Sequence, residues 1–254
     1  MELQNKLKPN NRTSIISTGQ AGYIIKSKSG QLLGIDLYLS DYVEKLEGNI
    51  GYKRLLPKLI NPKDIKLDVL IATHSHGDHY DKDSMEGLMA NDKTVLFTSV
   101  DCEEIVGQQG ISKDKVFYKK PGEEVKIKDF KVNFVDCDHG EGAPDAFGVV
   151  VQVDGKIIYE VGDSCLRIDY ANNIKERFPR VDVLIGPING AYGNMNEEEF
   201  AIFVDVIKPE IAIPCHYGMF ASHGGNPGKF YEIIKAKYSN QKICLMTQGE
   251  ELFL

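Results

Sequence analysis

The sequence predicts a four-layer αββα sandwich of the α/β (α+β) class, in which two β-sheets pack together and helices cover their outer faces. Short runs of apolar and β-branched residues, separated by turns that contain glycine, dominate the first half of the chain. The second half carries two amphipathic helical segments that alternate with further short strands. No repeat, low-complexity tract or linker divides the 254 residues, so we expect a single domain over residues 1–254.

In the first half, a polar segment between Asp36 and Leu67 interrupts the expected strands. It is long enough to form a flap, with helical turns around Asp41–Leu46. Helices are expected at Lys82–Met89 and Asp101–Gln108. The expected strands are Thr13–Ser17, Tyr23–Lys26, Gln31–Ile35, Leu67–Ala72, Glu124–Lys126, Lys131–Val135, Gly148–Val153 and Lys156–Val161.

Two helices in the second half are recognisable from their first residues. Asn196 can cap the first helix, and three glutamates follow in its first turn, where the helix dipole favours them. Asn226 can cap the second helix, and Pro227 suits its first position. Both segments have an apolar stripe at helical spacing. They alternate with expected strands at Val183–Ile185, Ile211–Ile213 and Ile243–Met246.

The composition is that of a globular protein with an excess of acidic residues. Thirty Lys and Arg stand against 37 Asp and Glu, a formal net charge of −7. Nucleic acid and anionic membranes need a basic face, so neither is expected as the main partner, and no apolar run is long enough to cross a bilayer. Residues 1–11 lack the apolar run of a secretory signal, and the five cysteines show no regular spacing. We therefore expect a cytoplasmic protein with reduced cysteines, and homo-oligomerisation stays open.

One short stretch, His-Ser-His-Gly-Asp-His, contains three of the six histidines in the chain. Imidazole and carboxylate groups are ligands for divalent cations. His74 and His76 point to the same side of an extended backbone, so both can reach one cation. Asp78 and His79 require the loop to turn toward a second cation, and Gly77 suits that bend. The alternative is a solvated polar loop, but so few histidines rarely cluster in this way by chance.

Three further loops place a metal-binding residue type directly after an expected strand. These residues are His139, Asp163 and His216. His139 or His216, taken alone, could be a structural histidine. Strand ends are where sheet enzymes commonly assemble their sites, so the four loops together predict one metal centre.

This combination of motifs resembles the metallo-β-lactamase superfamily. The resemblance spans nearly the whole chain, from Gly19 to the last expected strand. Within the superfamily, the chain is most similar to the L-ascorbate-6-phosphate lactonase group. The segments that carry this narrower resemblance are Gly19–Tyr23, Ile35–Asp36, Lys120–Glu123, Gly162–Ser164 and Ile213–Gly218.

The resemblance implies an αββα sandwich with a metal-dependent hydrolase site at the edge between the two sheets. It implies a first metal held by His74, His76 and His139, a second held by Asp78, His79 and His216, and Asp163 as the bridge between them. We assign Asp78 and His79 of this set as catalytic. The set offers nitrogen and oxygen donors only, which Zn, Mn and Fe all accept, and the lactonase resemblance favours Mn.

Further residues near these loops are candidates for substrate contact or for support of the ligands. Arg167 could bind a substrate phosphate, or it could be a surface or helix-end arginine. Asp36 could accept a hydrogen bond from a ligand imidazole, or it could stabilise a turn. Cys165 could approach the site, whereas Cys215 is expected in the core. The remaining substrate candidates, each of which could instead be a plain surface residue, are Asn189, Tyr192, Asn194, Tyr217 and His223.

Two divalent cations can share one water and lower its pKa to about 7, and the resulting hydroxide can attack a carbonyl carbon or a phosphorus. We therefore expect a hydrolase that opens a small lactone or ester. A phosphorylated sugar lactone is the implied substrate, because the cations would attract a small anion. One alternative is a phosphodiesterase for a small or cyclic phosphodiester, with an RNA-processing nuclease disfavoured by the acidic composition. A second alternative to the hydrolase is a non-catalytic binding protein that kept the fold.

Overall fold

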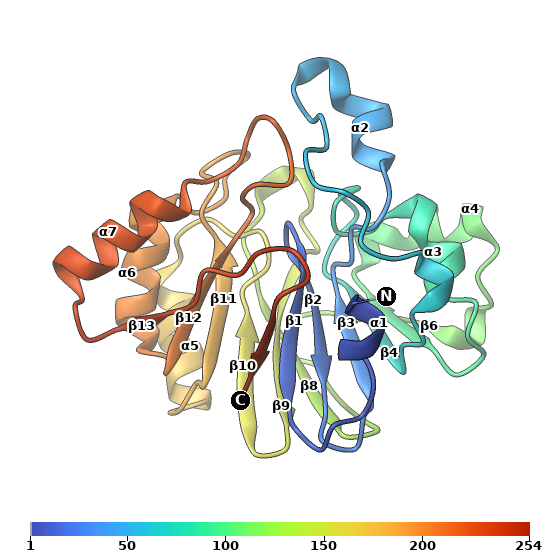
Figure 1. Ribbon diagram of the computed structural model, residues 1–254, viewed down its shortest axis with the longest axis horizontal. Helices are drawn as coiled ribbons and strands as arrows, with labels where there is room; N and C mark the ends of the chain where they lie inside the picture. Colours follow the sequence, from blue (N-terminus) through green and yellow to red (C-terminus); the bar gives the residue numbers. More distant parts are fainter. Residues whose placement is uncertain (1) are drawn as a thin grey trace.

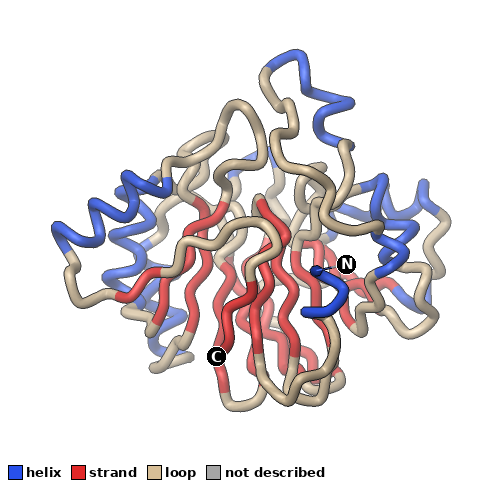
Figure 2. The backbone as a smooth tube through the Cα atoms, viewed as in Figure 1, coloured by secondary structure: helices blue, strands red, loops and turns tan. Residues whose placement is uncertain are grey.

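Two seven-stranded mixed sheets pack together in the centre of the molecule, and helices cover the outer side of each (Figure 1). The computed structural model describes residues 2–254. Figure 2 shows the strands gathered in the middle with helices on both flanks. The predicted four-layer αββα sandwich is confirmed. No helix within residues 2–254 is long and apolar enough to span a bilayer.

The first sheet contains most of the N-terminal half of the chain. Its strands run antiparallel on one side of β3 and parallel on the other side. Helices α3 (Lys82–Leu88) and α4 (Glu103–Gln109) form the crossovers between its last parallel strands. In spatial order the strands are β14 (Glu251–Phe253), β1 (Ser14–Gly19), β2 (Gly22–Lys26), β3 (Leu32–Ile35), β4 (Val69–Ala72), β5 (Val95–Thr98) and β6 (Val116–Tyr118).

The second sheet is also antiparallel at one end and parallel at the other. Helices α5 (Ile168–Arg177), α6 (Glu197–Ile207) and α7 (Pro227–Lys237) connect its parallel strands and cover its outer face (Figure 1). In spatial order its strands are β13 (Lys242–Ile243), β12 (Ile211–Cys215), β11 (Val183–Pro187), β10 (Lys156–Glu160), β9 (Phe147–Val153), β8 (Phe130–Asp136) and β7 (Glu124–Ile127).

The strands are apolar on both faces because each sheet is covered on both sides. In β9, Phe147, Val149 and Val151 face the other sheet, whereas Val150 packs under α5 and α6. A third apolar layer, which includes Met85 of α3, separates the first sheet from its own helices. Successive side chains of a strand therefore pack alternately into the core between the sheets and into the core beneath the helices.

Most predicted elements are confirmed, and the exceptions have local causes. Asn196 caps α6 in a capping box with Glu199, and Asn226 and Pro227 begin α7. The predicted strand Ile243–Met246 is wrong in extent, because only Ile243 of that range pairs, in β13. The sequence analysis missed β5, β6, β14, α1 (Glu2–Lys6) and α5. Only Ala171 and Ile174 of α5 are buried, so its apolar stripe is too thin to recognise.

The predicted flap, residues 37–66, is confirmed as a largely irregular segment. It contains α2 (Tyr42–Glu47) and short 3₁₀ turns at Gly48–Ile50 and Pro62–Asp64. In Figure 1, α2 rises above the edge of the sheets. Backbone hydrogen bonds tie the flap to the loop after β12, from Leu55 N to Met219 O (2.8 Å) and from Ala221 N to Lys53 O (2.9 Å).

Candidate metal centre

Four loops at the carboxyl ends of strands meet at one edge of the sandwich. One follows β4 of the first sheet and carries His74, and the other three follow β8, β10 and β12 of the second sheet. Because β8 and β10 run in the same direction as β12, all three release their chains at the same edge. The fold thereby brings His139, Asp163 and His216 to the histidine-rich loop.

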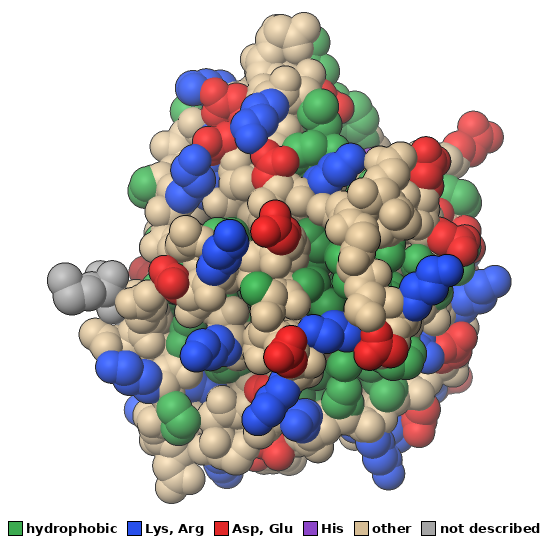
Figure 3. All heavy atoms as spheres, turned by 90° about the vertical axis from the view of Figure 1, so that its right-hand side faces the viewer, with side chains coloured by type: hydrophobic (Ala, Val, Ile, Leu, Met, Phe, Trp, Pro, Cys, Tyr) green, Lys and Arg blue, Asp and Glu red, His purple; other side chains and the backbone are tan. Residues whose placement is uncertain are grey.

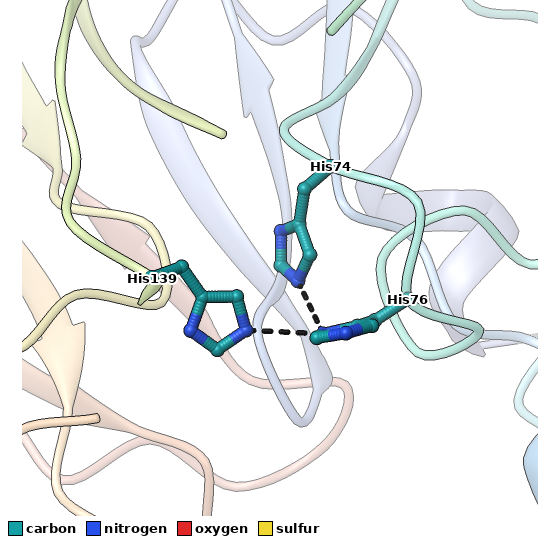
Figure 4. A group of neighbouring side chains, drawn as sticks. All are labelled: His74, His76 and His139. Carbon is teal, nitrogen blue, oxygen red and sulfur yellow. Dashed lines mark hydrogen bonds between the residues drawn. The ribbon is translucent and has the colours of Figure 1, made fainter. Parts of the chain in front are cut away.

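His74, His76 and His139 form a first group of converging imidazoles (Figure 4). Nε2 of His74 and Nε2 of His139 each lie 3.0 Å from Nδ1 of His76. Nitrogen ligands about 2.0–2.1 Å from one ion also stand about 3 Å apart when their bonds are near a right angle. This group therefore has the spacing of a metal-binding triad.

Asp78, His79 and His216 form a second group, and Asp163 lies between the two groups. Asp163 Oδ1 is 2.7 Å from His216 Nε2, and Asp163 Oδ2 is 3.3 Å from His79 Nε2. The same Oδ2 is 3.9 Å from Nε2 of His139 in the first group. The two oxygens of Asp163 thus face donors from both groups.

The buried donor atoms of the second group fit a divalent cation. His79 Nε2, His216 Nε2 and Asp163 Oδ1 are buried, and none of them makes a well-formed hydrogen bond with the described residues, although His216 Nε2 and Asp163 Oδ1 lie 2.7 Å apart. Buried polar atoms are rarely left without a partner, because each one costs free energy. A divalent cation held by these atoms would satisfy all three, and Zn, Mn and Fe all accept nitrogen and oxygen donors.

The electrostatic environment keeps several donors in their metal-binding form. Burial lowers the pKa of His74 well below its usual value and that of His139 to about 4, so both rings are neutral. Burial raises the pKa of Asp163, but His216 and His79 outweigh it and leave Asp163 ionised. Burial lowers the pKa of His79, but Asp163 and then Asp36 outweigh it and raise this pKa. His79 therefore holds a proton that a bound cation would displace.

A family model for the beta-lactamase superfamily domain matches residues 14–216. The chain belongs to the metallo-β-lactamase superfamily. It is a metal-dependent hydrolase of the UPF0173 family, 30% identical over 233 residues to a UPF0173 metal-dependent hydrolase of Aeropyrum pernix, with 84% of this chain and 94% of that protein covered.

Two solved structures show the same fold as this hydrolase. Igni18, a metallo hydrolase from Ignicoccus hospitalis, superimposes with a TM-score of 0.76 at 21% identity and covers 95% of this chain and 98% of its own. YhfI, a metallo-beta-lactamase fold protein from Bacillus subtilis, gives a TM-score of 0.70 at 14% identity, with 96% and 100% covered.

Asp36 supports the centre of this hydrolase from behind. Its Oδ2 accepts hydrogen bonds from His79 Nδ1 and from Thr73 Oγ1, each at 2.7 Å. Its Oδ1 accepts one from the Thr73 backbone N–H at 2.8 Å. The sequence analysis left two roles open for Asp36, and the structure shows the contacts of both. Since Nδ1 of His79 donates to Asp36, Nε2 is the nitrogen left to face a cation.

We expect Asp36→Asn to weaken the second group without unfolding the protein. The amide is a poorer acceptor than the carboxylate, so His79 loses orientation and basicity, and metal affinity falls about 10–100-fold. Competition with a chromophoric chelator measures this affinity. Asp68→Asn is the control, because Asp68 accepts a backbone hydrogen bond from Leu32 at the other end of β4. Equal affinities in both variants would contradict the role of Asp36.

The sequence analysis assigned no role to Gln20, which contacts two donors of the second group. Its Nε2 lies 2.9 Å from Asp78 Oδ2 and 2.9 Å from His216 Nδ1. Gln20, Asp36, Tyr192, His216 and His223 all have a positive φ, which non-glycine residues rarely adopt. Such strain gathers at functional sites, where the surrounding structure enforces it. In the sequence, Gln20 has the pattern of an ordinary polar residue in a tight turn, so no signal marks it as part of the site.

The structure separates the predicted substrate residues into two sets. Tyr192 and Asn194 line a cavity above the metal-binding groups, and Asn194 Nδ2 donates to Asp163 Oδ2 at 2.8 Å. Asn189 does not line this cavity, but it accepts a hydrogen bond from Asn194 Nδ2 at 3.2 Å. His223 does not line the cavity either, and its ring stacks against Tyr52 of the flap, which does.

The other predicted residues lie outside that cavity. Tyr217 donates to Met246 O at 2.6 Å and lines a separate cavity. Arg167 precedes α5 and pairs with Asp138 and Asp169 at 2.7 and 2.6 Å. Cys165 lies in a neighbouring hollow beside His139, and Cys215 is buried in the core between the sheets, as predicted.

Proposed function

We propose that this hydrolase opens a small lactone or ester at a centre that holds two divalent cations, Mn or Zn. The observation that carries the proposal is the division of six donors into two groups of three, with a seventh, Asp163, between them. The adjoining cavity, about 160 Å³, suits a small molecule. The resemblance to the L-ascorbate-6-phosphate lactonase group supports a lactone as the bond that is opened.

The bound cations would supply an acidified water and positive charge beside the substrate carbonyl oxygen. The chain's own residues would hold the cations and accept the proton of that water. Asp163 and Asp78 partly neutralise the cations, and Asn194 and Gln20 hold these carboxylates by hydrogen bonds. Asp78 lines the cavity and its side chain is 17% exposed, so we assign its carboxylate as the acceptor of a proton from a water at the centre. His79 is fully buried and is kept in position by Asp36.

The surface gives the nuclease alternative little support. On the face shown in Figure 3, basic and acidic side chains are interspersed and form no continuous basic area. A nucleic acid needs clustered positive charge to balance its phosphates. A small ester needs no such surface.

Metal removal tests the proposal. We expect dipicolinic acid to abolish hydrolysis of δ-valerolactone and p-nitrophenyl acetate, and Mn or Zn to restore it with full activity only near two equivalents per chain. Elemental analysis measures the metal, and a pH-stat measures hydrolysis. Only trace metal in protein purified from supplemented medium would favour a binding protein. Faster cleavage of bis(p-nitrophenyl) phosphate than of any lactone would favour the phosphodiesterase.

A further inference from the structure

The cavity above the metal-binding groups has a polar floor and an apolar wall. The floor consists of donor residues, including His76, Asp163 and His216. The wall is formed mainly by the flap, with Val43, Leu46 and Tyr52, and by Tyr192 from the loop after β11. The reacting bond must lie at the floor, so the rest of a substrate must lie against this wall.

No lysine or arginine lines this cavity in the part of the chain that the structure describes. Three basic side chains of the flap that are close in sequence to Leu46 and Tyr52 have other partners. Lys45 pairs with Asp83, and Lys53 pairs with Glu44. The Arg54 guanidinium is directed into the protein, where it donates to the carbonyl oxygens of Leu56 and Ser40. Glu47 is the one charged residue of the wall, and it is negative.

Arg167 does not supply the missing positive charge. Its guanidinium donates to Asp138 at 2.7 Å and to Asp169 at 2.6 Å, and it lies 4.1 Å from the centre of the Tyr170 ring. The guanidinium N–H groups that would donate hydrogen bonds to a phosphate are already bound to these partners. A phosphate against the wall would lose its hydration, face Glu47 and gain no cationic partner.

Aromatic contacts hold the wall in place. The Tyr52 ring stacks on His223 with centroids 4.8 Å apart and planes 6° apart, and it lies 6.4 Å from the Tyr192 ring. Burial and then contact with Tyr192 raise the pKa of Tyr52, so its phenol stays neutral. Leu46 and Tyr192 both line the cavity and are each 61% exposed, so they leave apolar surface open to a ligand.

We infer that the substrate carries an uncharged apolar group, such as a short alkyl chain, that packs against Leu46, Tyr52 and Tyr192 while its ester bond lies over the metal centre. This inference rests on the proposed function, because it takes the ester bond to the floor. It replaces the expected sugar phosphate with an alkyl-substituted lactone or ester. Burial of each additional methylene is expected to raise kcat/KM about fourfold until the cavity is filled.

A panel of lactones and two variants test the inference. For the wild-type protein with two equivalents of metal, we expect kcat/KM to rise from δ-valerolactone to δ-hexalactone to δ-octalactone. We also expect δ-octalactone to exceed glucono-δ-lactone 6-phosphate at least tenfold. Leu46→Lys should lower the δ-octalactone value about tenfold and raise the value for the phosphorylated lactone.

Leu55→Lys is the matched control. Leu55 lies in the same flap and is 59% exposed, close to the 61% of Leu46, but it does not line the cavity. Both variants place a lysine on an exposed flap position, so they change the net charge equally. We expect Leu55→Lys to keep both kcat/KM values within about twofold of the wild type.

The possible outcomes separate this inference from the proposed function. A preference of the wild type for the phosphorylated lactone would overturn the inference that the wall binds an apolar group. Equal effects of Leu46→Lys and Leu55→Lys would overturn it too. If the metal-loaded protein hydrolyses no lactone or ester, the proposed function fails. Ligand binding measured by calorimetry then tests whether the wall accepts an apolar group. In that case, 6-propylpiperidin-2-one, the lactam analogue of δ-octalactone, should bind to the wild type more tightly than glucose 6-phosphate does, and more weakly to Leu46→Lys than to the wild type; the reverse order would overturn the inference.

Discussion

His76→Ala is expected to cost the protein one of the two metals that we propose and to lower kcat/KM by on the order of 10²–10³-fold. Nδ1 of His76 lies 3.0 Å from Nε2 of both other imidazoles in its group, so its removal leaves two donors where three converged. His76 is half-buried at the cavity, whereas the cores are built from other residues. The melting temperature of the metal-free variant should therefore stay close to that of the metal-free wild type.

Elemental analysis of the purified variant, together with lactone turnover, measures this expected loss. Ser75→Ala is the control, because it alters the neighbouring residue of the same loop outside the group of donors. Wild-type metal content in His76→Ala would contradict the assignment of this residue as a ligand. Loss of metal in both variants would point to a general effect on the loop.

The parts of the fold that sequence could predict are those with local signals. The helix α6 begins at a capping box and continues as an apolar stripe, so neighbouring residues alone define it. Turns that contain glycine bound the strands β1, β2 and β3. By contrast, β14 has only three residues and pairs with β1 from the opposite end of the chain. Such a strand exists only because the sheet edge is there to receive it.

The same distinction applies to the candidate site. The donors in the loop after β4 lie within six residues, and their spacing alone indicates a metal site. Gln20 is 58 residues from Asp78 and 196 from His216, so only the folded chain brings its amide to them. Arg167 shows the opposite case, because it is close to Asp163 in sequence but forms ion pairs with Asp138 and Asp169 at the start of α5.

Asp163→Asn is expected to have the second large effect, because Asp163 faces both groups of donors. A carboxylate can offer one oxygen to each of two cations, whereas an amide offers one oxygen and an NH₂ group that cannot bind metal. The amide nitrogen would face either His216 Nε2, 2.7 Å from Oδ1, or the Asn194 amide, which donates to Oδ2. The loss of one negative charge also increases repulsion between two cations. The variant should retain one metal better than two.

Turnover of the Asp163→Asn protein should fall by on the order of 10²–10³-fold, since one of the two cations that we propose at the reacting bond would be lost. Metal stoichiometry and kcat measured on the same preparation test this expectation. Asp182→Asn serves as the control: Asp182 is also a buried aspartate that accepts a backbone hydrogen bond, but it lies before β11, at the opposite end of the second sheet. The control should keep two metals and near-normal kcat in whatever fraction folds. Two tightly held metals and near-normal kcat in Asp163→Asn itself would show that another residue bridges the groups.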